Sequence, residues 1–235
     1  MTAHLLTGAG SGIGAAVARR LAARGDDLWL LTRDAGRARQ LREQFPDART
    51  IVADLAEPER MSWAFGQQEL PASIDSLLHV AGVVELGRVD ELQVATWRKT
   101  LAVNTIAPAE LTRLLLPSLR AAKGQIVFVN SGAGLHASPD WSAYAASKFG
   151  LRAIADALRA EVRADGIRIT TVYPGRTATP MQQKVHAQEG RDYDAAEWID
   201  PESVATTILA ALDLPRDAEL TELTVRPGHA TRSRR

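Results

Sequence analysis

The stretch Leu5-Leu6-Thr7-Gly8-Ala9-Gly10-Ser11-Gly12-Ile13-Gly14 decides the fold. It places a short apolar strand before a glycine-rich turn and a helix, which is the order found in dinucleotide-binding units. Gly8 allows a sharp turn, Gly12 lets the backbone approach a pyrophosphate, and Gly14 lets the helix pack on the strand. The positive end of the helix then faces the anion. A purely structural turn is the alternative, which the rest of the chain must decide.

Strands and helices alternate along the rest of the chain. Further apolar strands are predicted at 27–32, 49–53, 74–81, 125–130, 167–173 and 220–225. Helices are predicted at 35–44, from Pro58, and at 92–119, 141–165 and 201–212. This alternation predicts an α/β fold, namely one doubly wound parallel sheet (a Rossmann fold) of about seven strands with helices on both faces. We expect a single domain over 1–235, with a short substrate-covering segment at 176–200 and a frayed tail at 227–235.

Composition excludes several classes of function. The chain has 235 residues, 28 basic and 28 acidic, so no net charge attracts nucleic acid or an anionic membrane. It has no cysteine, which excludes disulfides and thiolate catalysis, and its five histidines are too scattered to predict a metal site. No apolar run approaches the roughly 20 residues that cross a bilayer, and the N-terminus lacks a secretory signal pattern. We therefore expect a cytoplasmic protein with no membrane or nucleic-acid partner.

Tyr144 and Lys148 are spaced to lie on one face of the helix predicted at 141–165. A phenol normally titrates near pH ~10, and a fixed ammonium beside it favours the phenolate and lowers its pKa. Such a pair can exchange a proton with an alcohol or carbonyl oxygen at neutral pH. The spacing alone is more often that of an exposed helix face.

Two other polar residues belong to the same hypothesis. Ser131 follows the strand at 125–130, at the edge where open α/β sheets bind ligands, so its hydroxyl could bind a substrate oxygen; a turn residue is the alternative. Asn104 lies in the apolar part of the helix at 92–119, with Pro108 four residues later. Proline can free a backbone carbonyl for a water beside Lys148, and a locally satisfied kink is the alternative.

The end of the strand at 27–32 should lie beside the adenine ribose of a bound dinucleotide. NAD-binding folds usually place a carboxylate there, whereas this chain has Thr32 and Arg33. A guanidinium can bind a 2′-phosphate and stack beside the adenine, so the sequence favours NADP(H) over NAD(H). Asp34 could compete for Arg33, and a solvated loop residue is the alternative reading of Arg33.

Two positions near other strand ends also fit a dinucleotide. Asp54 could accept a hydrogen bond from an adenine amino group, or it could cap the helix that begins near Pro58. Gly82 has no side chain, so a ribose or nicotinamide could approach it.

Together these motifs resemble the short-chain dehydrogenase/reductase family. Residues 7–14 match its Thr-Gly-x-x-x-Gly-x-Gly motif and residues 144–148 its Tyr-x-x-x-Lys motif. Ser131, thirteen residues before Tyr144, also falls where the family has it, as do Asn104 and Pro174-Gly175. One departure is His79-Val80-Ala81-Gly82, where the family has Asn-Asn-Ala-Gly; we expect it to affect stability more than catalysis.

The resemblance implies an NAD(P)-dependent oxidoreductase that transfers a hydride between a nicotinamide and a carbonyl or secondary alcohol, acting as a carbonyl reductase. It implies that Tyr144 is the general acid, that Ser131 binds the same oxygen, and that Lys148 lowers the Tyr144 pKa and holds the ribose. It further implies that Asn104 keeps a water linking Lys148 to solvent, and that the helices carrying Asn104 and Tyr144 form a homodimer or homotetramer. A non-catalytic dinucleotide-binding regulator or scaffold is the alternative.

The predicted site residues come from the glycine-rich turn and the strand ends. The catalytic set is Asn104, Ser131, Tyr144 and Lys148. The cofactor set is Gly8, Ser11, Gly12, Ile13, Gly14, Arg33, Asp54, Leu55, Ala81, Gly82, Asn104, Tyr144, Lys148, Pro174, Gly175, Thr177 and Thr179. A partly apolar carbonyl substrate is expected to contact His136, Trp141 and Met181.

Overall fold

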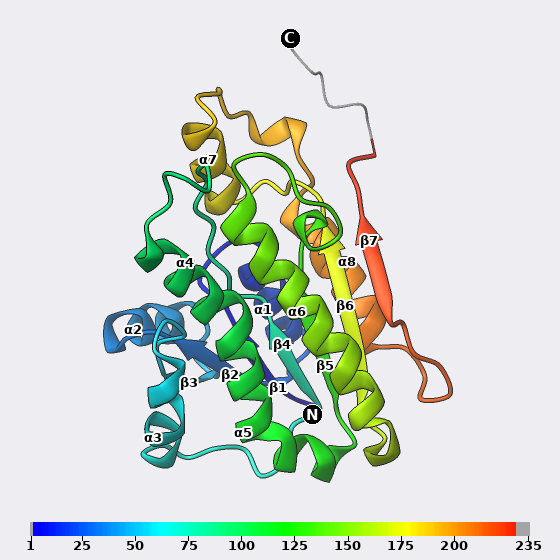
Figure 1. Cartoon of the computed structure of the whole chain (residues 1–235). Coiled ribbons are helices and arrows are strands. Elements are labelled where there is room, and N and C mark those ends of the chain that lie inside the picture. Colours follow the sequence, from blue (N-terminus) through cyan, green and yellow to red (C-terminus); the bar gives the residue numbers. More distant parts are fainter. Residues whose placement is uncertain (1, 229–235) are drawn as a thin grey trace.

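Alternating apolar strands and amphipathic helices build one parallel sheet covered on both faces (Figure 1). The computed structural model describes residues 2–228. Its seven strands lie in the order β3-β2-β1-β4-β5-β6-β7, and each neighbouring pair is parallel. The strand order reverses direction between β1 and β4, which is where open sheets of this kind bind ligands. The predicted doubly wound Rossmann fold is confirmed.

The element bounds agree closely with the predicted ranges. The strands are β1 (Ala3–Thr7), β2 (Asp27–Thr32), β3 (Arg49–Val52), β4 (Ser76–His79), β5 (Gln125–Val129), β6 (Arg168–Pro174) and β7 (Glu222–Val225). The helices are α1 (Gly12–Ala23), α2 (Ala35–Gln44), α3 (Met61–Gly66), α4 (Val94–Leu101), α5 (Ala107–Ala122), α6 (Ser142–Glu161), α7 (Pro180–Gln188) and α8 (Pro201–Leu212). Short helical turns are η1 (Pro58–Arg60), η2 (Ala102–Ile106), η3 (Gly132–Gly134), η4 (Arg163–Asp165) and η5 (Ala195–Glu197).

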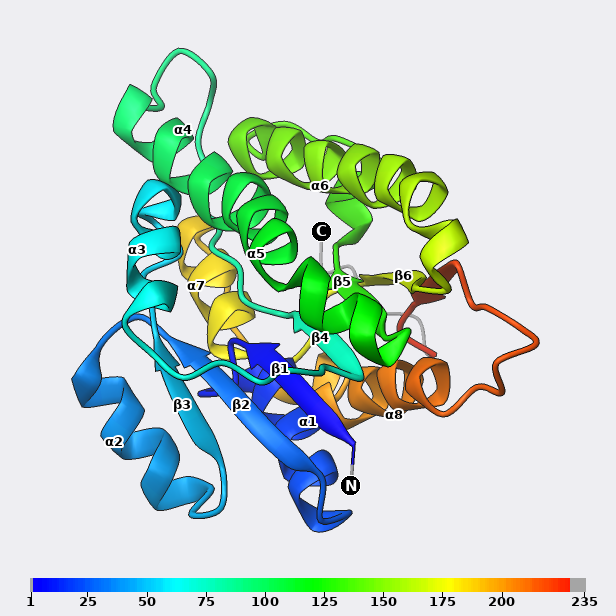
Figure 2. The same ribbon diagram turned by 90° about the horizontal axis from the view of Figure 1, so that it is seen from below.

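Successive apolar residues of the strands pack on opposite faces of the sheet. Leu77 of β4 joins the apolar cluster formed with α3, α5 and α6, whereas Leu78 joins the cluster formed with α1, α2 and α8. Figure 2 shows α5 and α6 on one side of the strands and α1 and α8 on the other. Burial on both faces explains why β4 and β5 have continuous apolar sequences rather than alternating ones. The strand ends are thereby fixed at a common edge.

The helix predicted at 92–119 is interrupted. It consists of α4, a π-helical turn η2 and α5. Pro108 has no backbone N–H, so it cannot bond the carbonyl of Asn104 four residues earlier, and the wider turn accommodates this loss. The predicted covering segment at 176–200 contains α7 and η5. The predicted frayed tail at 227–235 lies outside the described residues from 229 onward.

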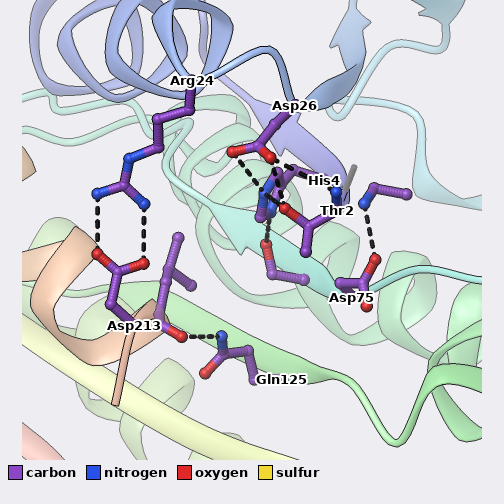
Figure 3. A network of polar contacts seen from close by, with 10 residues as sticks. Thr2, His4, Arg24, Asp26, Asp75, Gln125 and Asp213 are labelled. Carbon is purple, nitrogen blue, oxygen red and sulfur yellow. Dashed lines mark hydrogen bonds and ion pairs between the residues drawn. The ribbon is translucent and has the colours of Figure 1, made fainter. Parts of the chain in front are cut away.

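A polar network braces the opposite, N-terminal edge of the sheet (Figure 3). His4 Nδ1 lies 2.5 Å from the Ser76 hydroxyl, and His4 Nε2 lies 3.4 Å from the Asp26 carboxylate. Burial is the main cause that lowers the pKa of His4. Arg24, the residue after α1, pairs through both terminal nitrogens with Asp213 after α8, at 2.8 Å each. Ser76 is completely buried, so this Ser–His–Asp arrangement joins strands and offers no accessible nucleophile.

His79 replaces the first asparagine of the family pattern as a brace between the sheet and α5. Its Nε2 lies 3.0 Å from the Thr112 hydroxyl, and its ring stacks on Phe128 with centroids 4.8 Å apart and planes 6° from parallel. Both side chains are buried, so the ring contributes apolar packing as well as a hydrogen bond. Burial lowers the pKa of His79 to about 3, and the imidazole is neutral at physiological pH.

Lowering the pH from 7 to 5 should therefore destabilise the wild-type protein by about 2 kcal/mol more than a His79→Asn variant. The pKa of His79 is lowered in the folded state. Below pH 6.5 the imidazole is therefore protonated in the unfolded chain, whereas in the folded chain it stays neutral until the pH approaches about 3. The contribution of His79 is intact above pH 6.5 and is lost as the pH falls toward 3. Urea unfolding of both proteins at pH 7 and pH 5 measures the difference, and parallel pH profiles would contradict it.

Candidate active site

A cleft of about 650 Å³ opens at the C-terminal edge of the sheet, where strand ends, η3, α6 and α7 meet. It collects most residues predicted from the sequence: Gly8, Ser11, Gly12, Ile13, Gly14, Ala81, Gly82, Ser131, His136, Trp141, Tyr144, Lys148, Pro174, Gly175, Thr177, Thr179 and Met181. Four predicted residues do not line it: Asn104, Arg33, Asp54 and Leu55.

The glycine-rich turn has the backbone geometry that the sequence predicts. Gly8 and Gly12 have φ values of +78° and +52°, which side chains rarely tolerate. A Cβ on Gly14 would lie 2.1 Å from the Gly8 carbonyl oxygen, so α1 can approach β1 only because this side chain is missing. Ser11 precedes α1 without a side-chain cap, and no acidic residue occupies its first turn. The first amides of α1 are thus available to an anion.

Thr7 connects this turn to the neighbouring strand end. Its hydroxyl oxygen accepts hydrogen bonds from the backbone N–H groups of Val80 and Ala81, each at 3.0 Å. A Cβ on Gly8 would lie 2.9 Å from the Ala81 nitrogen. The turn after β1 and the chain after β4 therefore meet at backbone distance and form one floor of the cleft.

Tyr144 and Lys148 both lie on the buried face of α6. The Lys148 ammonium donates a hydrogen bond to the Val129 carbonyl at 3.0 Å and lies 5.8 Å from the centre of the Tyr144 ring. Burial lowers the pKa of Lys148 to about 8. The pair is thus assembled as the spacing predicts.

The predicted direction of the Tyr144 pKa is wrong for the protein alone. Burial raises the pKa of this phenol, and a hydrogen bond with the Ser131 hydroxyl opposes the shift. Removal of water from the phenol disfavours its anion, while the Lys148 ammonium is directed at the Val129 carbonyl. Tyr144 is consequently a protonated hydroxyl at neutral pH.

Asn130, which is not among the predicted site residues, positions Ser131. Its side-chain oxygen accepts the Ser131 N–H at 2.8 Å, and its side-chain nitrogen donates to the Lys148 carbonyl at 3.0 Å. A Cβ on Gly134 would lie 2.3 Å from this Asn130 side-chain oxygen, so only a glycine fits there. The end of β5 is thereby fixed to α6. A polar residue that ends an otherwise apolar strand was the available signal.

Asn104 is buried, and its side-chain oxygen and nitrogen both form hydrogen bonds with neighbouring residues. Its side-chain oxygen accepts the Val83 N–H and its nitrogen donates to the Val83 carbonyl, both at 2.8 Å. The nitrogen also donates to the Ser147 hydroxyl at 3.0 Å. A Cβ on Gly82 would lie 3.3 Å from this Asn104 oxygen and 3.8 Å from Lys148 Nζ. The side chain thus holds the loop after β4 against α6.

Arg33 and Asp54 lie on the exposed side of the strand ends. Arg33 Nε lies 3.0 Å from the Asp34 carboxylate, and the Arg33 side chain is 66% exposed. The other Asp34 oxygen accepts the Arg37 N–H at 2.8 Å and caps α2. The Asp54 carboxylate accepts the Ala56 N–H at 2.9 Å within the turn before η1. It does not cap that helical turn, whose N-cap residue is Glu57, so the capping alternative is wrong.

The substrate end of the cleft contains aromatic and cationic side chains. The Trp141 ring meets the Tyr144 ring edge-on, with centroids 5.7 Å apart. Arg176 and Arg226 also line this end, and the sequence analysis assigned no substrate role to either. Within residues 2–228 no three potential metal ligands cluster, and no described helix is long and apolar enough to cross a bilayer.

Comparisons with known proteins agree with this geometry. The family model for short chain dehydrogenase matches residues 2–190. The glycine betaine reductase of Emericella nidulans is 32% identical over 235 residues, which is 95% of this chain and only 18% of that much longer protein. An uncharacterized oxidoreductase of Staphylococcus saprophyticus is 29% identical over 95% of this chain and 96% of its own length.

Solved structures give the same result. A metagenomic short-chain oxidoreductase in complex with NADP is 28% identical, with a TM-score of 0.80 over 97% of this chain and 98% of that one. A serine dehydrogenase complexed with NADP+ shares the fold with a TM-score of 0.85 at 22% identity, covering 96% and 95% of the two chains. The family match over most of the chain, together with the shared fold, shows that this protein belongs to the short-chain dehydrogenase/reductase family of oxidoreductases.

Proposed function

We propose that this protein is an NADPH-dependent carbonyl reductase. One observation carries the proposal: Ser131, Tyr144 and Lys148 converge in the same cleft as an uncapped helix N-terminus and a glycine turn. The residues fit a dinucleotide, because the floor is made of backbone that a Cβ would obstruct and α1 presents free amides. NADPH, when bound, supplies the hydride.

The side chains of the cleft supply the proton and stabilise the developing charge. Tyr144, kept protonated by burial, donates its hydroxyl proton to the carbonyl oxygen of the substrate. Ser131 donates a hydrogen bond to the same oxygen as negative charge develops there. Lys148 holds the ribose and returns a proton to Tyr144. A water on the Asn104 carbonyl, which Pro108 cannot bond, links Lys148 to solvent.

The test is to mix the protein with NADPH or NADH and a panel of ketones and aldehydes, and to follow the nicotinamide absorbance. Consumption of NADPH with at least one carbonyl compound is expected. Tight binding of NADPH with no consumption across the panel would instead identify a non-catalytic dinucleotide-binding protein.

Replacing Arg33 with alanine should weaken NADPH binding about 10-fold and change NADH binding less than about twofold, because one exposed charge-assisted hydrogen bond to the 2′-phosphate is lost. The role is supported by the exposed position of Arg33 beside β2 and by Asp34, which bonds only Nε of Arg33 while its other oxygen caps α2. Fluorescence titration with both cofactors measures it. Arg42→Ala is the matched control, because Arg42 is exposed at the far end of α2 and bonds Thr50. Equal losses for both cofactors in Arg33→Ala would rule out the assignment.

We also propose a homodimer or homotetramer through α4, η2, α5 and α6. Ile106 and Phe149, which are 50% and 42% exposed, are large apolar side chains on these helices. Burying them against a second copy removes apolar surface from water. Sedimentation analysis would distinguish these assemblies from a single chain of 25.4 kDa. The cytoplasmic location stays a prediction, which fractionation of the source cells would test.

A further inference from the structure

In the described part of the chain, the lining of the cleft contains cationic side chains but no acidic ones. Lys148, Arg176 and Arg226 line it, whereas no aspartate or glutamate of the described chain does. Positive charge in a partly enclosed site attracts anionic ligands. The three cations differ in whether they already have a hydrogen-bond or ion-pair partner within the protein.

Two of the three have internal partners. Lys148 donates to the Val129 carbonyl and belongs to the proton path. Arg176 pairs with the Glu189 carboxylate through both terminal nitrogens, at 2.5 and 2.8 Å. Its guanidinium also lies 5.8 and 5.5 Å from the ring centres of Trp141 and Trp198. The charge of Arg176 is therefore neutralised, and the residue holds α7 over the cleft.

Arg226 is the exception. It follows β7, which pairs with β6 at the edge of the sheet (Figure 1). The chain there is fixed by a hydrogen bond of 2.8 Å from the Gly175 N–H to the Val225 carbonyl. A Cβ on Gly132 would lie only 3.2 Å from Arg226 Nη1, so the guanidinium sits against the residue that follows Ser131. Within residues 2–228, Arg226 has no ion-pair partner.

The position of Arg226 separates it from the dinucleotide phosphates. The pyrophosphate turn follows β1, and β7 lies four strand positions away in the sheet. The guanidinium reaches back to Gly132 just beyond the end of β5, which lies two strand positions from β1, or about 10 Å at the usual strand spacing. Arg33, the candidate for the 2′-phosphate, is one strand farther on the other side. Arg226 thus faces the substrate end of the cleft.

We infer that Arg226 binds a carboxylate of the substrate, and that the substrate is a keto acid whose acid group lies a few carbons from the carbonyl. This rests on the proposed function. The ketone accepts a hydride from NADPH at carbon and a proton from Tyr144 at oxygen, giving a hydroxy acid and NADP+, while the carboxylate stays unchanged. A guanidinium fork matches a carboxylate with two parallel hydrogen bonds, which fixes the carbonyl beside Ser131 and Tyr144.

The test compares acids with their methyl esters, for example acetoacetate and levulinate with methyl acetoacetate and methyl levulinate. The ratio of kcat/KM for acid over ester should exceed about 10 in the wild type and fall about 10- to 100-fold in Arg226→Gln, the loss expected for charge-assisted hydrogen bonds. Arg226→Lys should retain part of the preference. Arg163→Gln is the matched control, because Arg163 is an exposed arginine in η4, beyond the far end of α6, and should keep the wild-type ratio.

A binding measurement separates this inference from the proposed function. Saturation-transfer NMR of levulinate and methyl levulinate, with NADP+ present, reports binding whether or not turnover occurs. Preferential binding of the acid that is lost in Arg226→Gln supports the carboxylate site, even if no ketone is reduced. Equal binding of acid and ester, or an acid preference that survives Arg226→Gln, overturns it.

Discussion

Replacing Tyr144 with phenylalanine should lower kcat for ketone reduction about 10²- to 10⁴-fold, the usual contribution of a positioned general acid. In the proposed mechanism the phenol is the proton donor, and burial raises its pKa and keeps its hydroxyl protonated. The substitution removes one oxygen and keeps the ring, so the edge-on contact with Trp141 should persist. Stopped-flow or steady-state loss of NADPH absorbance measures the effect, and fluorescence titration should show NADPH binding within about twofold of wild type.

Tyr173→Phe is the control for this experiment. The Tyr173 hydroxyl donates to the Glu222 carboxylate at 2.9 Å, and Tyr173 does not line the cleft. Loss of this phenol should leave turnover close to the wild-type value. Full activity in Tyr144→Phe would falsify the assignment of the general acid.

Gly14→Ala should destabilise the fold by about 3 kcal/mol, at the upper end of the cost of inserting a methyl group into a packed core. The added Cβ would lie 2.1 Å from the Gly8 carbonyl oxygen and 2.6 Å from its carbon, so α1 must move away from β1. That movement displaces the first amides of α1, which are proposed to bind the pyrophosphate, and NADPH affinity should drop at least about 10-fold. Urea unfolding and fluorescence titration measure the two effects.

Gly10→Ala provides the comparison within the same turn. A Cβ on Gly10 would have no heavy atom within 4 Å, so its unfolding free energy should stay within about 0.5 kcal/mol of wild type. If both alanine variants lost equal stability, chain flexibility rather than the contact with Gly8 would be the cause.

The fold and the central residues were accessible from sequence because they depend on local patterns. Gly8 and Gly14 predict the turn, and the continuous apolar strands predict a sheet that is buried on both faces. Tyr144 and Lys148 share a helix, so helical periodicity places them together. The roles depended on contacts that periodicity does not describe. The raised pKa of Tyr144 comes from burial beneath elements distant in sequence.

Other parts of the site required the three-dimensional structure. Asn130 is the last residue of the strand predicted at 125–130, and its partner Lys148 lies eighteen residues away on another element. Arg226 reaches Gly132 only because β7 returns to the edge beside β6. His79 could be recognised as a departure, but its partner Thr112 on α5 follows from packing. Long-range pairing is set by the whole core rather than by any short stretch.

The Asn104 side chain, which receives from and donates to the same residue, Val83, acts as one artificial rung of a β-ladder. These two bonds fix the chain after β4, where strand pairing has already ended. On the opposite side of the cleft, α7 is held by the Arg176–Glu189 ion pair.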